Sequence, residues 1–196
     1  HIFAVKPSTN FTKRVPLNLV MLSDSKWTSE LVLEELRGIE RVFAQCEVSF
    51  RPITLIQTST KNARKWWSDF DAAADAKIFD AHLMTTRPTI LYRRPGGSYS
   101  WPSYYLNEST EGHPELYPQL LNTAVVSYAG YLVDKNTDYV PKDYVVSAHE
   151  LAHILFNSPH RGNCGNLLHG GPTCKGSQLT PEDCEALRLA PALRSP

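Results

Sequence analysis

The stretch AHELAHILFNSPH, residues 148–160, contains three of the seven histidines in the sequence. His149 and His153 are four residues apart, so an α-helix places them on one face, one turn apart. Two imidazoles at this spacing can bind one metal ion through their ring nitrogens. Glu150 lies beside the first histidine, where its carboxylate can accept a proton from a water molecule on that metal. The stretch therefore predicts a zinc site in which Glu150 is the general base.

The same helix has an apolar face. Four of its residues are expected to point into the protein core: Ala148, Leu151, Ala152 and Leu155. Burying polar side chains costs free energy unless they find partners, so packing alone gives no reason to place two histidines and a glutamate on the remaining face. The pattern thus favours a metal site over a chance occurrence of the motif on a surface helix.

A third ligand is needed, because a catalytic zinc usually has three protein ligands and leaves the fourth position to water. His160 is the best candidate, since it follows the predicted helix 143–156 closely and one reversal of the chain can return it to the metal. Asn157 tolerates the left-handed conformation that such a reversal needs, although glycine is more usual there. His169 is the second candidate, and an acidic ligand such as Asp183 is a further possibility.

Length and composition indicate one globular domain, 1–196. The chain has 196 residues, 42% hydrophobic and 20% charged, enough for a core of its own. The formal net charge is zero, so nothing global attracts nucleic acid or an anionic membrane surface. No apolar run is long enough to span a bilayer. The chain starts without Met or a signal-peptide layout, which we interpret as a mature or trimmed end, compatible with a removed signal or pro-segment.

The first third of the chain predicts a strand–helix–strand unit. The apolar run 15–22 suits a buried strand, and 48–57 alternates roughly as a second strand does. Between them, 29–45 has an apolar stripe at helical spacing, with Thr28 or Ser29 as its N-cap. This order predicts a parallel pair of strands joined by a crossover helix.

The rest of the chain continues the mixture of helices and strands. A helix is predicted at 71–83, and strands at 88–94 and 122–133. Residues 95–118 are rich in Gly, Pro, Ser and aromatic residues and predict a long surface loop. The last helix is expected to follow Thr180, an N-cap, with a proline at its first position. The predicted fold class is therefore mixed, α+β.

The four cysteines suggest disulfides. No CxxC pair is present, which argues against a thiolate zinc finger or a thioredoxin-type site. Disulfides require an oxidising compartment, so we expect a secreted or periplasmic protein. Four cysteines allow three pairings, and sequence alone does not choose among them.

Taken together, these segments resemble the metzincin zinc peptidases, the bacterial matrixin-like members in particular. The family signature is HExxHxxGxxH, followed by a methionine-containing turn beneath the metal. The first half is matched fully by residues 149–160, whereas the second half has one extra residue, with Asn157 one place after the family's glycine. CGNLLHGG, 164–171, is similar to the methionine turn, with Leu168 at the methionine position. LTPEDCEALR, 179–188, is similar to the short C-terminal helix.

The resemblance implies a metzincin-like zincin: a twisted mixed β-sheet, two long helices (the first helix and the zinc-binding helix) and a short C-terminal helix. It implies a zinc-dependent endopeptidase that hydrolyses peptide bonds through a zinc-activated water. A peptide or protein substrate would lie extended along an edge strand, for which 88–94 and 122–133 are candidates. Leu is nearly isosteric with Met, so Leu168 should preserve the shape beneath the metal. We expect a monomer.

The same resemblance gives the cysteines a role. Cys164 and Cys174 bracket the turn that contains Leu168, and a bridge between them would fix it. Cys46 at the end of the first helix would then pair with Cys184 in the last one.

Two other functions fit the motif. One is a zinc-bearing module that binds peptides without cleaving them, and the other is a zinc hydrolase that acts on a non-peptide amide. Glu150 distinguishes the first from an enzyme, because a binding module has no need of a general base.

Overall fold

A computed structural model describes residues 13–22, 25–58, 88–93, 103–106, 122–136, 143–156, 160–170 and 175–190. The described strands form one five-stranded sheet in the order β2-β1-β3-β5-β4. The first four in this order run parallel, and β4 is antiparallel to β5. The strands are β1 (Lys13–Leu22), β2 (Val48–Thr58), β3 (Thr89–Arg93), β4 (Ser103–Leu106) and β5 (Thr123–Ser127). The helices are α1 (Ser29–Phe43), α3 (Tyr128–Asn136), α4 (Val146–Phe156) and α5 (Pro181–Leu189), with a short 3₁₀ turn η1 (Ala44–Cys46). The predicted mixed α and β class is confirmed.

β1 is the first strand of the predicted strand–helix–strand unit and lies between β2 and β3 in the sheet. It pairs in parallel with β2 on one side and with β3 on the other, which explains why its sequence is a nearly continuous apolar run. Val15, Leu17 and Leu19 are fully buried. The predicted parallel pair with a crossover helix is therefore confirmed.

α1 begins where its sequence predicts. The side chain of Thr28 accepts a hydrogen bond from the amide of Leu31 and caps the helix. Most of the apolar stripe is buried, whereas Leu33 is only half-buried. The predicted end at 45 was too late by two residues, because the last turn tightens into η1.

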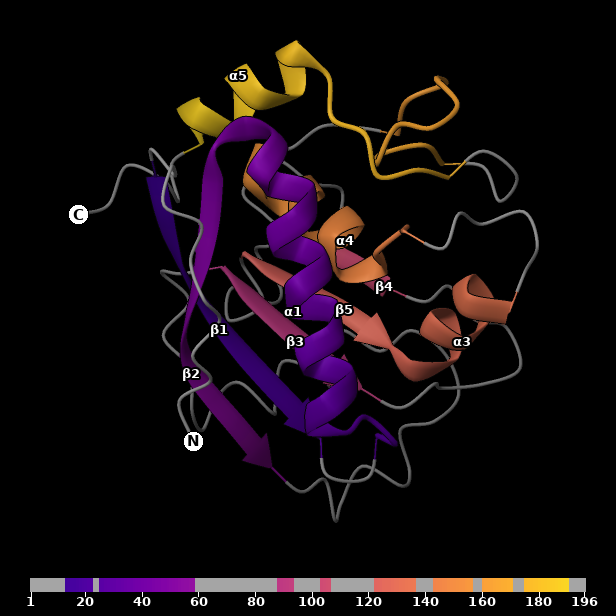
Figure 1. Cartoon of the computed structure of the whole chain (residues 1–196). Coiled ribbons are helices and arrows are strands. Elements are labelled where there is room, and N and C mark those ends of the chain that lie inside the picture. The colour runs from indigo at the N-terminus through magenta and orange to yellow at the C-terminus, as the bar shows by residue number, and fades with distance from the viewer. Residues whose placement is uncertain are drawn as a thin grey trace.

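α1 and α4 pack against each other beside the sheet (Figure 1). Gly38 of α1 lies against Val145, the residue before α4: an added Cβ at Gly38 would lie 2.5 Å from Cγ2 of Val145. Only glycine fits this contact, so the glycine sets the separation between the start of α4 and the first helix.

The predicted strand 122–133 was wrong in its second half. The strand ends at Ser127, and α3 starts at the next residue. An apolar run does not by itself distinguish a strand from a helix, and the sequence showed no turn signal between the two.

The predicted loop 95–118 was also wrong in part, because it contains β4. This strand pairs antiparallel with β5, from Ser103 opposite Val126 to Leu106 opposite Thr123. The pairing is non-local, so the surrounding Gly and Pro residues gave no local sign of it. The finding also corrects the edge strand: β3 and β5 are both interior, and β4 is the last strand at this end of the described sheet.

The remaining predictions have mixed outcomes. β3 falls within 88–94, and α5 starts at Pro181 with a capping box formed by Thr180 and Asp183. α4 starts three residues later than predicted. The helix predicted at 71–83 lies outside the described residues. None of the helices in the described ranges has the length and hydropathy that crossing a bilayer requires.

Candidate metal centre

α4 carries the first part of the site and is buried on all sides. Its apolar residues belong to the main core, and its three ionisable side chains are nearly inaccessible as well. His149 is 5% exposed, Glu150 is 7% exposed and His153 is 1% exposed. Such burial is unfavourable for isolated polar groups, so these side chains require specific partners.

The three predicted histidines come together at one point. Nε2 of His149 lies 3.2 Å from Nε2 of His153 and 3.3 Å from Nε2 of His160. The ring centroids are 4.8 to 5.3 Å apart. Within the described residues, these three form the group of side chains that could bind a metal ion. The runner-up ligands His169 and Asp183 are not part of this group.

The nitrogen separations fit a tetrahedral metal. Ligands at Zn–N distances of about 2.0–2.1 Å in tetrahedral geometry are about 3.3–3.4 Å apart. The separations of 3.2 and 3.3 Å agree with this value. Hydrogen bonds between the rings would also give such distances, but Nε2 of His149 would then have to bond to both His153 and His160. The donor set and its spacing therefore fit zinc.

The tautomer of His149 is fixed by the backbone. Its Nδ1 lies 2.5 Å from the carbonyl oxygen of Leu167. A carbonyl only accepts, so Nδ1 donates and, in the neutral ring, the lone pair is on Nε2. Burial lowers the pKa of His149 well below its usual value, and the nearby His153 lowers it further. His149 is thus neutral at pH 7 and directs a lone pair at the other two histidines.

His160 reaches the site from a separate turn, 160–170, which lies against α4. The amide of Arg161 donates to the carbonyl of Leu168 at 2.9 Å and closes this turn. Gly170 lies directly against the imidazole, because an added Cβ would be 2.8 Å from Cγ of His160. His160 is the exposed member of the three, so the site opens to solvent on its side. The predicted role of Asn157 lies outside the described residues.

Leu168, which is predicted to lie beneath the metal, is fully buried. The side chain of Asn166 accepts from its amide at 2.8 Å, and the preceding residue provides the carbonyl that holds His149. A large apolar side chain is therefore buried in this turn, and its place beneath the metal stays a prediction.

Replacing Leu168 by Met is expected to leave zinc content unchanged and to alter stability by less than about 1.5 kcal/mol. The apolar volume is nearly conserved, whereas Leu168→Ala would lose about 2–5 kcal/mol by opening a cavity. Denaturant unfolding and metal analysis of both variants measure this difference. Zinc loss on Leu168→Met would show that the leucine has a role beyond filling space.

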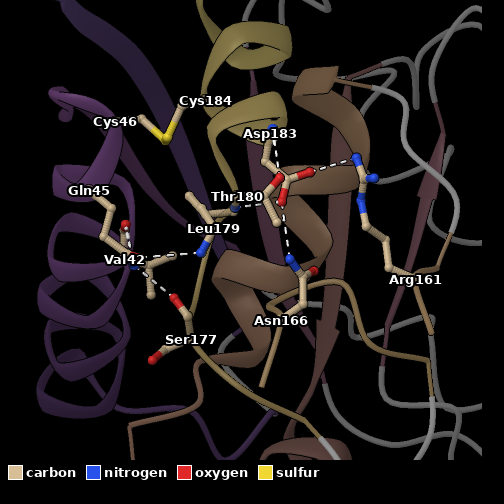
Figure 2. Close-up of a disulfide and its surroundings, with 10 residues drawn as sticks. All are labelled: Val42, Gln45, Cys46, Arg161, Asn166, Ser177, Leu179, Thr180, Asp183 and Cys184. Atoms are coloured by element: carbon tan, nitrogen blue, oxygen red, sulfur yellow. Dashed lines mark hydrogen bonds and ion pairs between the residues drawn. A yellow bond between two sulfur atoms is a disulfide. The ribbon is translucent and has the colours of Figure 1, made fainter. Parts of the chain in front are cut away.

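Asp183 of α5 connects the turn to the rest of the protein (Figure 2). Its buried carboxylate lies 2.6 Å from the guanidinium of Arg161 and accepts from the side-chain amide of Asn166 at 3.1 Å. It also completes the capping box with Thr180. One carboxylate therefore fixes the residue next to His160, the turn around Leu168 and the start of α5.

The predicted disulfide between Cys46 and Cys184 is present, with Cα atoms 5.0 Å apart (Figure 2). It links η1 to α5, next to Asp183. Cys164 is disulfide-bonded as well. Its predicted partner Cys174 lies outside the described residues, so that pairing stays a prediction.

Glu150 is placed next to the histidines and not among them. Its Oε1 lies 3.9 Å from Nε2 of His149. Glu150 is not a member of the group of three histidines that could bind a metal ion. Its predicted role as general base stays a prediction.

Comparison with known proteins supports the architecture. No protein-family model and no curated protein matches the sequence. The structure is similar to metalloproteinase-II from Bacteroides fragilis, with a TM-score of 0.59 and 11% identity over 96% of this chain. It is also similar to archaemetzincin from Methanopyrus kandleri, with a TM-score of 0.55 and 14% identity over 94% of this chain. The chain has the fold of these metalloproteinases. It spans 56% of the Bacteroides chain and 98% of the Methanopyrus chain.

Three contributors to the site were missed in the sequence. Two glycines follow His169 in the sequence, and a glycine can indicate a close contact. The structure shows such a contact between Gly170 and the ring of His160. The carbonyl of Leu167 had no signal, because every residue has a carbonyl. Asp183 was considered as a metal ligand, whereas its contacts with Arg161 and Asn166 give it a structural role.

Proposed function

We propose that this protein is a zinc-dependent endopeptidase in which His149, His153 and His160 bind the metal and Glu150 is the general base. The observation that carries the proposal is the convergence of three imidazoles beside a buried glutamate, with Nε2 of His149 3.2 Å and 3.3 Å from Nε2 of the other two. The metalloproteinase fold supports it. The similarity of 149–171 and 179–188 to metzincin segments supports a matrixin-like member.

Zinc is favoured by the donor set. Three imidazoles without a fourth protein ligand are typical of catalytic zinc, which keeps one position for water or substrate. When bound, zinc would lower the pKa of a water molecule and polarise the scissile carbonyl. The exposure of His160 leaves room for a substrate on that side.

Glu150 would perform the proton transfers. Its carboxylate accepts a proton from the attacking water and then donates it to the leaving amine. Its low exposure, 7%, limits competition from bulk solvent for that proton. Because Glu150 directly follows His149 on α4, its position relative to the histidines is set by the helix itself.

The substrate would bind along β4. A peptide added next to this strand would satisfy the backbone hydrogen-bonding groups that the described sheet leaves on its outer side. β4 also contacts α4, so a peptide bound there passes close to the histidines. A peptide bound in this extended form can extend beyond the cleavage site in both directions, as an endopeptidase requires.

A secreted or periplasmic location fits the proposal. The buried Cys46–Cys184 bridge forms and persists in an oxidising compartment. We further propose a single catalytic domain that acts as a monomer.

The test is to measure zinc content and cleavage of a broad peptide library by the purified protein. One zinc per chain with cleavage inside the peptides supports the proposal. Zinc without any cleavage would favour the peptide-binding module, and hydrolysis of amides other than peptides would favour the second alternative. A protein that holds no zinc after mild purification would refute the central claim.

His160→Ala is expected to weaken zinc binding more than about 100-fold, beyond the effect of losing a residue that merely supports a ligand. His169→Ala is the matched control, because it lies on the same turn but outside the group of three. It should change zinc affinity little. Competition with a chelator measures both. If His169→Ala were the more damaging change, the third ligand would be misassigned.

A further inference from the structure

The residue before α4 has no side chain that can cap the helix. The first N–H groups of a helix have no intrahelical acceptors, and α1 and α5 satisfy theirs with Thr28 and Thr180. The residue before α4 is Val145, whose side chain accepts nothing. The acceptor comes instead from another helix: the amide of Ser147 donates to Oε2 of Glu35 on α1 at 3.2 Å.

This contact is deeply buried and sterically fixed. Glu35 is 1% exposed and Ser147 is 0% exposed. Gly38 follows Glu35 by one turn and lies against Val145, the residue before α4. On the other side, the hydroxyl of Ser147 lies 3.4 Å from that of Tyr92 on β3. Ser147 is therefore held between α1 and the sheet.

The cap does not depend on the charge of Glu35. Burial raises the pKa of this carboxyl, and the hydrogen bonds from Ser147 oppose the rise. Among the neighbouring charges, Lys135 favours the ionised form and Glu34 disfavours it. Both the acid and the carboxylate have an oxygen that can accept from the amide of Ser147.

We propose that Glu35 caps α4 from α1 and thereby positions His149 and Glu150. These two residues are the fourth and fifth of the helix, within its first turns, and helix ends fray. A functional side chain must be held to within about 0.5 Å, which an uncapped first turn does not ensure. Glu35 is thus a positioning residue; this role rests on the metal site proposed above, although the cap itself does not.

The experiment compares Glu35→Leu with a matched variant, Glu40→Leu. Glu40 lies on the same helix, is half-buried and accepts from the amide of Phe50 at 2.6 Å, but it faces β2 instead of α4. Amide hydrogen exchange is measured on zinc-free protein, and zinc affinity is measured by chelator competition.

We expect Glu35→Leu to speed exchange at the amides of His149 and Glu150 by about five- to thirtyfold, the effect of losing a helix cap. Zinc affinity should fall by about 10- to 100-fold. Glu40→Leu should lower global stability without either local effect. Equal behaviour of the two variants would show that Glu35 is only a packing residue, and would overturn the proposal.

Two rescues make the test specific. Glu35→Gln keeps an acceptor oxygen and should restore both measurements. Val145→Thr, added to Glu35→Leu, provides a local N-cap of nearly the same shape as valine and should restore them too. A Glu35→Leu chain that folds only after Val145→Thr is added supports the proposal equally. A double variant no better than Glu35→Leu overturns it.

The exchange measurement separates this proposal from the proposed function. A wild-type protein that binds no zinc would refute the metal site, yet the exchange of the first turn of α4 would still report whether Glu35 caps it. Normal exchange in Glu35→Leu with zinc bound by the wild type would refute only the cap.

Discussion

Glu150→Ala is expected to slow peptide hydrolysis by about 10²- to 10⁴-fold, the usual contribution of a general base, while one zinc stays bound. The carboxylate is 3.9 Å from Nε2 of His149 and outside the group of three histidines. Its loss is therefore expected to remove the proposed proton acceptor and to leave the proposed metal ligands in place. The loss should appear in kcat, because proton transfer belongs to the chemical step and not to substrate binding.

The measurement pairs zinc analysis with kcat and KM for one peptide found in the library digest. Glu185→Ala is the control, since Glu185 is exposed on α5 and has no role in the proposed mechanism. Glu150→Gln keeps the size of the side chain and should be as inactive as Glu150→Ala. Hydrolysis at the wild-type rate in a zinc-loaded Glu150→Ala protein would mean that another group is the base.

The double variant Cys46→Ala/Cys184→Ala is expected to lose up to about 5 kcal/mol of unfolding free energy. The bridge closes a loop of 138 residues, and loop-closure entropy for that length gives this upper value in the chain-entropy model. Both cysteines are buried in the main core. The bridge fixes α5, which carries Asp183, and Asp183 pairs with Arg161 next to His160. Zinc affinity should therefore fall together with stability.

Denaturant unfolding of the variant and the wild type under non-reducing conditions measures the loss. The variant is preferable to a reducing agent, because Cys164 is also disulfide-bonded and a reductant would break that bridge too. Glu185→Ala is again the control, since an exposed substitution should leave the unfolding free energy nearly unchanged. A loss below about 1 kcal/mol would show that packing around Asp183 holds α5 without the bridge.

Local signals in the sequence predicted much of the fold. Thr28 and Thr180 marked two helix starts correctly, because capping depends on residues within one turn. β1 was predicted from its apolar run, and its neighbours β2 and β3 from similar patterns. Two predictions failed in part: the loop over 95–118, which contains β4, and the strand over 122–133, whose second half is α3. Local patterns did not reveal either element.

The sequence by itself determined the chemistry of the site: two histidines one helical turn apart with Glu150 between them, because helix geometry fixes that spacing locally. The tertiary structure alone decided which distant groups complete it. Only folding brings Nε2 of His160 to 3.3 Å from His149, places the Leu167 carbonyl behind that ring and sets Glu35 at the start of α4. Such contacts join residues up to 112 positions apart, and no local pattern encodes a distance across the core.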